Sequence, residues 1–284
     1  MAARKLLCYL LAAALCATAL AEDKKPAEKD APRVLLLSAS SLVRGRANKL
    51  VLRGVNLAGT TAAWVDGSPP AETQPAAPAA ATQPSTQPAT SQPTVITTLA
   101  VRLTSHAKSD APKPFDAARV GDSQVELEVD LPSSPGPAEV TLVLATATGQ
   151  AKTPPLAVLD GQDVIDEQEP NNGFREAQPI EFGKTIRGSI QAPDDVDVYR
   201  FTGRAGQRVR IEVLAARAGS LLDSTISLYD THYRSLFTND DSDLGSDSLI
   251  TATLPTDGIY YMSITDANDT GSPVHGYQLT FKEE

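Results

Sequence analysis

Residues 167–172 read E-Q-E-P-N-N, and residues 193–201 read P-D-D-V-D-V-Y-R-F. Pro170 disfavours the helical region for the residue before it, so an extended backbone is expected at Glu169. Side chains alternate sides along an extended chain, so Glu167 and Glu169 are expected to point the same way. Carboxylates this dense repel one another unless water solvates them or a cation bridges them. The stretch therefore predicts an acidic, extended segment followed by an acidic turn that opens a strand.

Beyond this stretch, apolar and polar residues alternate as they do in strands with one buried face. Arg208, Arg210 and Glu212 are expected on one face of such a strand, with Val209, Ile211 and Val213 on the other. The same alternation groups Tyr199 with Phe201, Tyr260 with Met262 and Ile264, and Tyr277 with Leu279 and Phe281. This pattern is typical of stacked antiparallel sheets. The only helix candidate after the N-terminus is one short turn around 173–177.

Several phrases of this region, taken in order, resemble one known family. They are E-P-N-N at 169–172, D-D-V-D-V-Y-R-F at 194–201, A-G-Q-R-V-R-I-E-V at 205–213, L-D-S-T-I-S-L-Y-D at 222–230, N-D-D-S-D at 239–243, L-P-T-D-G-I-Y-Y-M-S-I at 254–264 and Y-Q-L-T-F at 277–281. Residues 163–284 resemble the bacterial pre-peptidase C-terminal domain, which is found beside many extracellular proteases. The resemblance implies a secreted, jelly-roll-like β-sandwich.

The resemblance also implies a structural calcium site, because calcium-binding relatives draw ligands from the acidic segment and the acidic turn. Carried over by motif, the candidate ligands are Glu167, Glu169, Asn171, Asn172, Asp194 and Asp197. Carboxylate and amide oxygens are the ligands that Ca²⁺ prefers. Asn172 stands where such relatives can carry an acid, which predicts weaker affinity. The alternative is that Glu167 and Glu169 form a solvated linker, and that Asp194 and Asp195 only make a turn.

A second acidic run lies at 239–243, with Asp247 nearby. Its alternation is similar to an EF-hand loop, but Leu244 stands where that loop needs glycine and Ile250 where it needs the closing glutamate. A solvated hairpin loop is therefore favoured over a second metal site.

Residues 33–160 show a separate series of short strand patterns. The phrases L-V-L-R-G-V-N-L at 50–57, V-E-L-E-V-D-L-P at 125–132 and P-G-P-A-E-V-T-L-V-L-A-T at 135–146 resemble the IPT/TIG family of immunoglobulin-like domains. That resemblance implies a second β-sandwich, which serves spacing or binding rather than catalysis. The fold class predicted for the whole chain is therefore all-β, with two β-sandwich domains at 33–160 and 163–284.

The composition changes abruptly at 68–94, where Thr-Gln-Pro occurs three times and Ser-Gln-Pro once. Such a segment cannot bury enough apolar surface to offset its chain entropy, which predicts disorder. It is interpreted as an insertion within the first domain, because too few strands precede it to close a sandwich. A true linker between two pieces is the alternative.

The N-terminus has the features of a secretory signal peptide, predicted at 1–21. Arg4 and Lys5 precede an apolar run that is too short to span a bilayer, and Ala19-Leu20-Ala21 is a small-x-small cleavage site. A flexible leader is expected at 22–32. A lipoprotein anchored at Cys16 is the second interpretation and a retained membrane anchor the third. No later segment is apolar enough to span a membrane.

Catalysis finds no support in the sequence. The only cysteines, Cys8 and Cys16, lie in the predicted signal, and no H-E-x-x-H, G-x-S-x-G or C-x-x-C pattern is present. The three histidines, His106, His232 and His275, fall among loop residues, where isolated histidines are usually solvated. We therefore predict that the protein is not an enzyme and assign no catalytic residue.

The net charge and the aromatic residues indicate which classes of binding partner to expect. The net charge of −10 and pI of about 4.8 argue against nucleic acid and anionic membranes. Tyr229, Tyr233 and Tyr261 could line a recognition surface, as in collagen-binding relatives, or fill a half-buried sheet face. The predicted function is a secreted, periplasmic or cell-surface binding protein for an extracellular protein or polysaccharide. The alternative is an accessory for the folding, secretion or targeting of a separately encoded extracellular peptidase or hydrolase.

Overall fold

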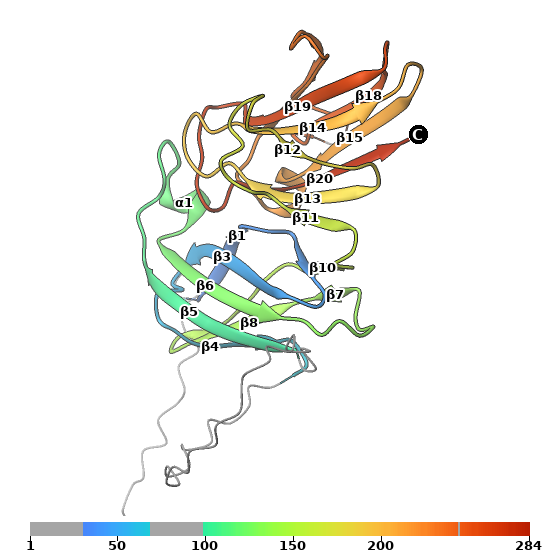
Figure 1. Ribbon diagram of the computed structural model, residues 1–284. Coiled ribbons are helices and arrows are strands. Elements are labelled where there is room, and N and C mark those ends of the chain that lie inside the picture. Colours follow the sequence, from blue (N-terminus) through green and yellow to red (C-terminus); the bar gives the residue numbers. More distant parts are fainter. Residues whose placement is uncertain (1–30, 69–98, 244) are drawn as a thin grey trace, which may run out of the picture.

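The computed structural model describes residues 31–68, 99–243 and 245–284. The predicted signal peptide (1–21), residues 22–30 of the predicted leader and nearly all of the predicted insertion (68–94) lie outside them. Within the described residues, strands dominate and helix is confined to short turns, which confirms the predicted all-β class (Figure 1). Among these residues no helix has the length and apolar character needed to cross a bilayer.

The N-terminal region, residues 33–159, is built from short strands and one turn of helix. Its elements are β1 (Arg33–Leu37), β2 (Ser41–Val43), β3 (Ala47–Val55), β4 (Thr60–Val65), β5 (Ala100–Lys108), α1 (Ala117–Val120), β6 (Ser123–Asp130), β7 (Glu139–Val140), β8 (Leu142–Thr146), β9 (Gly149–Lys152) and β10 (Leu156–Leu159). They form sheets in the orders β1-β3-β6-β5, β2-β10-β7 and β4-β8-β9. Across the β3–β6 pair, Leu50 opposes Leu127 and Leu52 opposes Val125, and all four are buried in one core.

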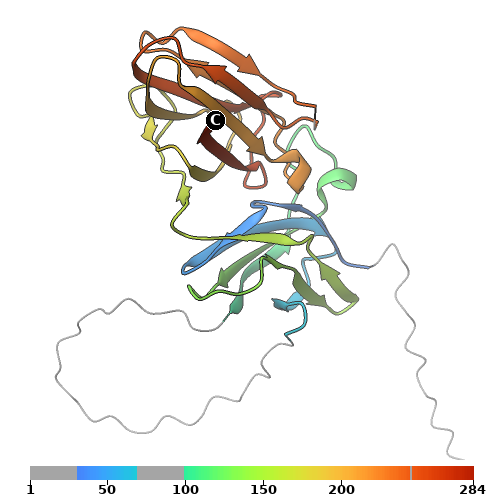
Figure 2. The same cartoon turned by 90° about the vertical axis from the view of Figure 1, so that its right-hand side faces the viewer.

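The C-terminal region, residues 164–283, contains two five-stranded sheets. Its strands are β11 (Val164–Asp166), β12 (Gln178–Pro179), β13 (Lys184–Ser189), β14 (Asp197–Gly203), β15 (Arg208–Leu214), β16 (Ser224–Tyr229), β17 (Ser235–Asn239), β18 (Leu249–Thr253), β19 (Gly258–Asp266) and β20 (Gly276–Glu283), with a 3₁₀ turn at Ala216–Ala218. The sheet orders are β11-β13-β20-β15-β18 and β12-β14-β19-β16-β17. Figure 2 shows this region stacked on the N-terminal region.

The core of the C-terminal region lies between its two sheets and contains the predicted apolar faces. Along β15 the burial alternates residue by residue, so Val209, Ile211 and Val213 are buried while their neighbours are more exposed. The aromatic rings of Phe201 and Phe281, which come from opposite sheets, lie 4.5 Å apart between centroids. The alternation read from the sequence is therefore confirmed in this region.

Contacts between the two regions fix the start of the C-terminal one. Arg187 of β13 donates to Asp166 Oδ1 from Nε and Nη2, at 3.0 and 2.8 Å, and from Nη1 to Asn48 Oδ1 at 3.0 Å. Arg46 of the N-terminal region pairs with the other oxygen of Asp166 at 2.8 Å. At Gly276 a Cβ atom would lie 1.7 Å from the Ser38 carbonyl oxygen, so only glycine permits this approach. The chain just before Glu167 is thus anchored to both regions.

Local expectations fail at three places. The sequence analysis missed α1, although Asp116 caps its first turn by accepting from Arg119 N at 3.0 Å and Gly121 ends it at φ 80°. His275 was expected to be solvated, but it is fully buried. Asp247 was expected in a solvated loop, but it is buried as well. Asp247 is enclosed because residues 215–217, about 30 positions earlier, supply its hydrogen-bond donors. His275 bonds to nearby Thr270 and Ser272, and the ring of Phe115 from the N-terminal region lies 5.9 Å from its own between centroids. The expected turn near 173 is present, with Glu176 N donating to Gly173 O at 3.0 Å.

Candidate metal centre and aromatic surface

The acidic segment, residues 167–172, leaves β11 and lies against strands β13 and β14. Glu167 N donates to Arg187 O of β13 at 2.9 Å, and Val198 N of β14 donates to Asn171 O at 2.9 Å. These two backbone bonds fix both ends of the segment. They carry it past the first residue of β14, which is Asp197.

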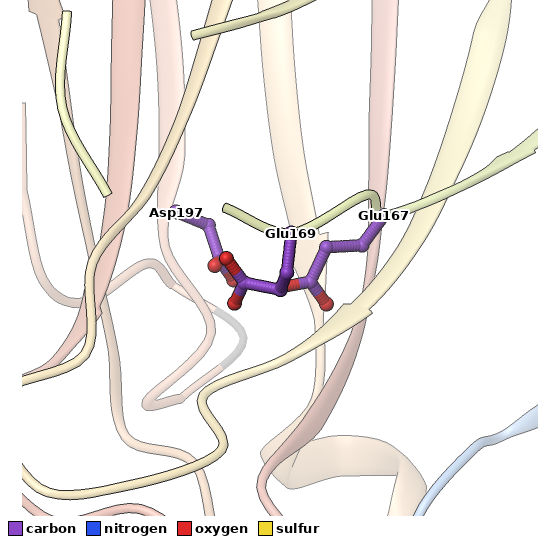
Figure 3. A group of neighbouring side chains, drawn as sticks. All are labelled: Glu167, Glu169 and Asp197. Carbon is purple, nitrogen blue, oxygen red and sulfur yellow. The ribbon is translucent and has the colours of Figure 1, made fainter. Parts of the chain in front are cut away.

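Three carboxylates meet where the acidic segment passes β14. One oxygen each from Glu167, Glu169 and Asp197 lies within 4.8 Å of the others (Figure 3). Glu169 is exposed, Glu167 is half-buried and Asp197 is fully buried. We call this set the carboxylate group. Glu167 and Glu169 are two residues apart on one segment, whereas Asp197 follows Glu169 by 28 residues, so folding brings Asp197 to the other two.

One oxygen of each carboxylate has a hydrogen-bond donor. Ser189 N donates to Glu167 Oε2 at 2.7 Å, Asn171 N donates to Glu169 Oε2 at 2.9 Å, and the Tyr277 hydroxyl donates to Asp197 Oδ2 at 2.6 Å. The Tyr199 hydroxyl lies 2.6 Å from that of Tyr277 and completes the chain. These contacts hold each carboxylate in one orientation.

The second carboxylate oxygens of the two buried acids differ from the first, because they lack hydrogen-bond donors among the described residues. Glu167 Oε1 and Asp197 Oδ1 are buried and have no hydrogen-bond partner among the described residues, and the same holds for Asn171 Oδ1 and Nδ2. A buried polar atom without a partner costs about 1–3 kcal/mol, and clustered negative charges add repulsion. A hard cation that accepts carboxylate and amide oxygens would relieve both costs, so the residues present fit calcium.

Burial dominates the electrostatics of the group. Desolvation, followed by the neighbouring Asp197, raises the pKa of Glu167. Desolvation also raises the pKa of Asp197, against the hydrogen bond from Tyr277, which lowers it. Burial raises the pKa of Tyr199 and of Tyr277 well above the usual range, so both remain neutral hydroxyl donors. Without a cation, the two buried acids therefore tend to hold a proton.

The six predicted ligands separate into three sets. Glu167, Glu169 and Asp197 form the carboxylate group, and Asn171 is buried beside it on the same segment. Asn172 is exposed. Asp194 is exposed at φ 63° in the turn before β14 and does not belong to the carboxylate group. Its neighbour Asp195 accepts from Gln191 N and Val196 N, as a turn residue does.

Sequence reasoning missed the hydroxyl groups that support the carboxylates. Tyr277 and Tyr199 were assigned to core faces by their alternation, and their rings do lie in the core. Nothing in the alternation shows that their hydroxyls converge on Asp197, because Tyr277 follows Asp197 by 80 residues. A buried tyrosine needs a hydrogen-bond partner, and that requirement is the one signal available from the sequence.

A second feature, the aromatic cluster, lies on the same region. The ring of Phe174 stacks on Tyr233, with centroids 4.7 Å apart, and meets Tyr229 and Tyr261 edge-on at 5.1 and 5.2 Å. Tyr229 and Tyr261 are half-buried, whereas Tyr233 is 51% exposed. Two of these tyrosines therefore cover the sheet and Tyr233 is presented to solvent, while a recognition surface stays a prediction.

A comparison with known protein families gives a match for part of the C-terminal region. The family model described as the bacterial pre-peptidase C-terminal domain matches residues 195–266. These residues belong to that family. The matched part of the pre-peptidase C-terminal domain begins at the acidic turn and includes Asp197, but Glu167 and Glu169 precede it. The match does not reach 33–160, where the IPT/TIG kinship stays a prediction.

One curated relative and two solved structures complete the comparison. A probable subtilase-type serine protease of Deinococcus radiodurans is 40% identical over 107 residues, which are 37% of this chain and 15% of the relative. The pre-peptidase C-terminal domain of a Bacillus anthracis collagenase is 22% identical, covering 41% of this chain and all of that one, with a TM-score of 0.32. A Bacteroides ovatus protein, SGBP-B, solved with a mixed-linkage heptasaccharide, is 10% identical over 89% of this chain and 75% of its own, with a TM-score of 0.25. These TM-scores are too low for either structure to support a conclusion about this chain.

Proposed function

We propose that this chain is an exported, non-catalytic binding protein of the periplasm, cell surface or extracellular space. On this proposal its two domains span 33–160 and 163–284, and the second one binds the partner. The aromatic cluster is the observation that carries the proposal, because it leaves the ring of Tyr233 half exposed on a packed support of three other rings. Aromatic residues held this way are typical anchors of binding surfaces.

Binding is tested on insoluble matrices with the full chain. The purified protein is incubated with collagen fibrils and with a set of insoluble polysaccharides, and the fraction that sediments is measured in calcium and in chelator. We expect sedimentation with one matrix class. A chain that sediments with none of the matrices under either condition would contradict the binding function.

We further propose that a calcium ion is bound at the carboxylate group as a structural cofactor. Glu167, Glu169 and Asp197 would supply carboxylate oxygens and Asn171 its amide oxygen. A ligand that binds only the folded state stabilises it, by about 2.7 kcal/mol at a concentration 100 times Kd. We therefore expect calcium to raise the Tm of the full chain by about 5–10 °C over the value in chelator. A Tm that calcium leaves unchanged would rule the ion out.

A second candidate function follows from the curated relative. Because part of this chain is 40% identical to part of a subtilase-type protease, the chain could assist the folding, secretion or targeting of a separately encoded extracellular peptidase or hydrolase. Co-purification of such an enzyme from the native envelope in stoichiometric amount would favour this accessory role. Retention on a matrix without any enzyme would favour the binding protein.

A further inference from the structure

We propose that the aromatic notch binds one pyranose unit of a neutral polysaccharide, which stacks its apolar face on Tyr233. The notch is a cavity of about 300 Å³, lined by Gly173, Phe174, Arg175, Glu176 and Tyr233. This inference rests on the proposed binding function and assigns it a ligand class and a subsite.

The backbone at Tyr233 points to a role for its ring. Tyr233 has φ 61°, in the left-handed region that glycine adopts without cost and that other residues adopt only at a cost in free energy. A residue held in that region at a surface turn, with its large ring half exposed, suggests selection for something other than stability. Binding is the simplest such role for an exposed aromatic ring.

The turn that carries Tyr233 is rigidly built. Asp230 Oδ1 accepts from His232 N at 2.8 Å and from Arg234 N at 3.0 Å, while Arg234 Nε donates to Asp230 Oδ2 at 2.8 Å. Tyr233 N itself donates to Asp230 O at 3.0 Å. The ring is therefore positioned before any ligand arrives, which lowers the entropy lost on binding.

Packing behind the ring completes the support. Phe174 stacks on Tyr233, and Tyr261 of β19 lies 5.2 Å from it between centroids. Register places Tyr229 of β16 directly opposite Tyr261, so the support continues into the sheet. The result is a firm aromatic wall at one side of the notch.

The rest of the notch favours a sugar ring over a proline ring. A pyranose has an apolar face of C–H groups and a rim of hydroxyls, and the notch offers an aromatic wall together with Arg175 as donor and Glu176 as acceptor. A proline ring has no hydroxyls, so it would form no hydrogen bond with Arg175 or Glu176. Ser227 and Thr238, whose hydroxyls lie 2.9 Å apart, continue a hydroxyl-rich surface along β16 and β17. The presence of both charge signs at the rim, on a chain of net charge −10, disfavours a polyanion.

The volume also limits the ligand. A cavity of about 300 Å³ is at the lower end of small-molecule sites and suits one ring rather than a chain of rings. A polymer would therefore contact this notch with one unit and lie across the surface with its neighbours. Single monosaccharides are expected to bind weakly and polymers more strongly.

The test uses affinity electrophoresis of the full chain, in saturating calcium, through gels that contain soluble neutral polysaccharides: β-1,3-glucan, mixed-linkage β-glucan, xylan and galactomannan. Tyr233→Gly removes the ring, and relief of the strained φ of 61° offsets part of the packing lost against Phe174 and Tyr261, so the variant is expected to stay folded, which its Tm checks. Phe237→Ala is the matched control. Phe237 is an aromatic residue that is 43% exposed on β17, and it pairs across the strands with the buried Leu228 of β16.

We expect at least one polysaccharide to retard the wild type. Tyr233→Gly is expected to weaken that binding about 10-fold, while Phe237→Ala leaves it unchanged. Retardation that survives Tyr233→Gly would overturn the notch as the subsite. Sedimentation with collagen fibrils without any retardation by these polysaccharides would overturn the sugar ligand and leave the binding function intact. A chain that binds neither class would refute the binding function as well.

Discussion

The buried acidic side chains of the C-terminal region differ in whether their carboxylate oxygens have hydrogen-bond donors. Asp247 is buried and fully partnered: Oδ1 accepts from Ala215 N at 3.0 Å and Ala216 N at 2.7 Å, and Oδ2 accepts from Arg217 Nε at 2.6 Å. In the carboxylate group, Glu167 and Asp197 each keep one buried oxygen that no group of the described residues donates to. Acid density alone therefore does not mark a metal site. The informative observation is which buried oxygens the protein leaves unpaired.

The sharpest test of this contrast removes the fully partnered acid. Asp247→Ala leaves the backbone N–H groups of residues 215–217 and Arg217 Nε without this acceptor, so we expect a loss of about 3 kcal/mol in the free energy of unfolding. Because the partners of Asp247 are protein groups, the loss should be the same in calcium and in chelator, as measured by denaturant unfolding. A loss of stability that appears only in calcium would indicate that the ion is bound at Asp247 rather than at the carboxylate group.

The tyrosine hydroxyl that holds Asp197 offers a matched comparison within one core. Tyr277→Phe removes the donor to Asp197, and Tyr260→Phe removes the hydroxyl that donates to Thr256 O at 2.7 Å. Each change is expected to cost about 1–2 kcal/mol of unfolding free energy. Calorimetric titration should show weaker calcium binding for Tyr277→Phe only. Equal calcium affinity in both variants would argue against Asp197 as a ligand.

Replacing one acid of the carboxylate group should act differently in the two conditions. Burial raises the pKa of Glu167, so without a cation this acid tends to hold a proton, and in chelator we expect Glu167→Gln to leave stability nearly unchanged. In calcium the same variant should lose the Tm increase seen for the wild type. Glu128→Gln, at a half-buried position of β6 where Glu128 lies 3.7 Å from Arg102, is the control and should change Tm little and equally in both conditions. Destabilisation of Glu167→Gln in chelator would show that its charge is already compensated.

The smallest expected effect concerns a fully partnered neutral group. Buried His275 lies 3.0 Å from Thr270 Oγ1 through Nε2 and 2.8 Å from Ser272 Oγ through Nδ1. Desolvation lowers its pKa below 6.5, against the nearby Asp266 carboxylate, which raises it, and with Arg119, which lowers it further. The folded state then binds fewer protons than the unfolded state, so stability from this group is lost as pH falls below about 6.5.

The measurement is denaturant unfolding of wild type and His275→Asn in chelator between pH 7 and pH 5. The wild type should lose more stability over this range than the variant, because only the wild type gains a proton on unfolding at this position. Identical slopes would show that His275 is not charged on unfolding in this range.

The sequence by itself determined the strand faces of the C-terminal region and the acidic residues of the segment that precedes it. Alternation is a local property, since successive side chains of a strand point to opposite sides, and so Val209, Ile211 and Val213 were assigned to the core correctly. The signals that begin and end α1, Asp116 and Gly121, are local features of the sequence as well. The family resemblance at 195–266 rested on the same local phrases.

Only the tertiary structure decided which acids meet and what else surrounds them. Whether Asp194 or Asp197 faces Glu167 depends on the turn before β14, and a shift of one residue there would reverse the face. The donors of the group, Ser189 N and the Tyr277 hydroxyl, come from strands that only sheet pairing brings near. Asp247 likewise takes its donors from residues 215–217, and the buried ring of His275 lies beside Phe115 of the other region. Hydrogen-bond partners and desolvation are sums over distant segments, and a local pattern of residues does not contain them.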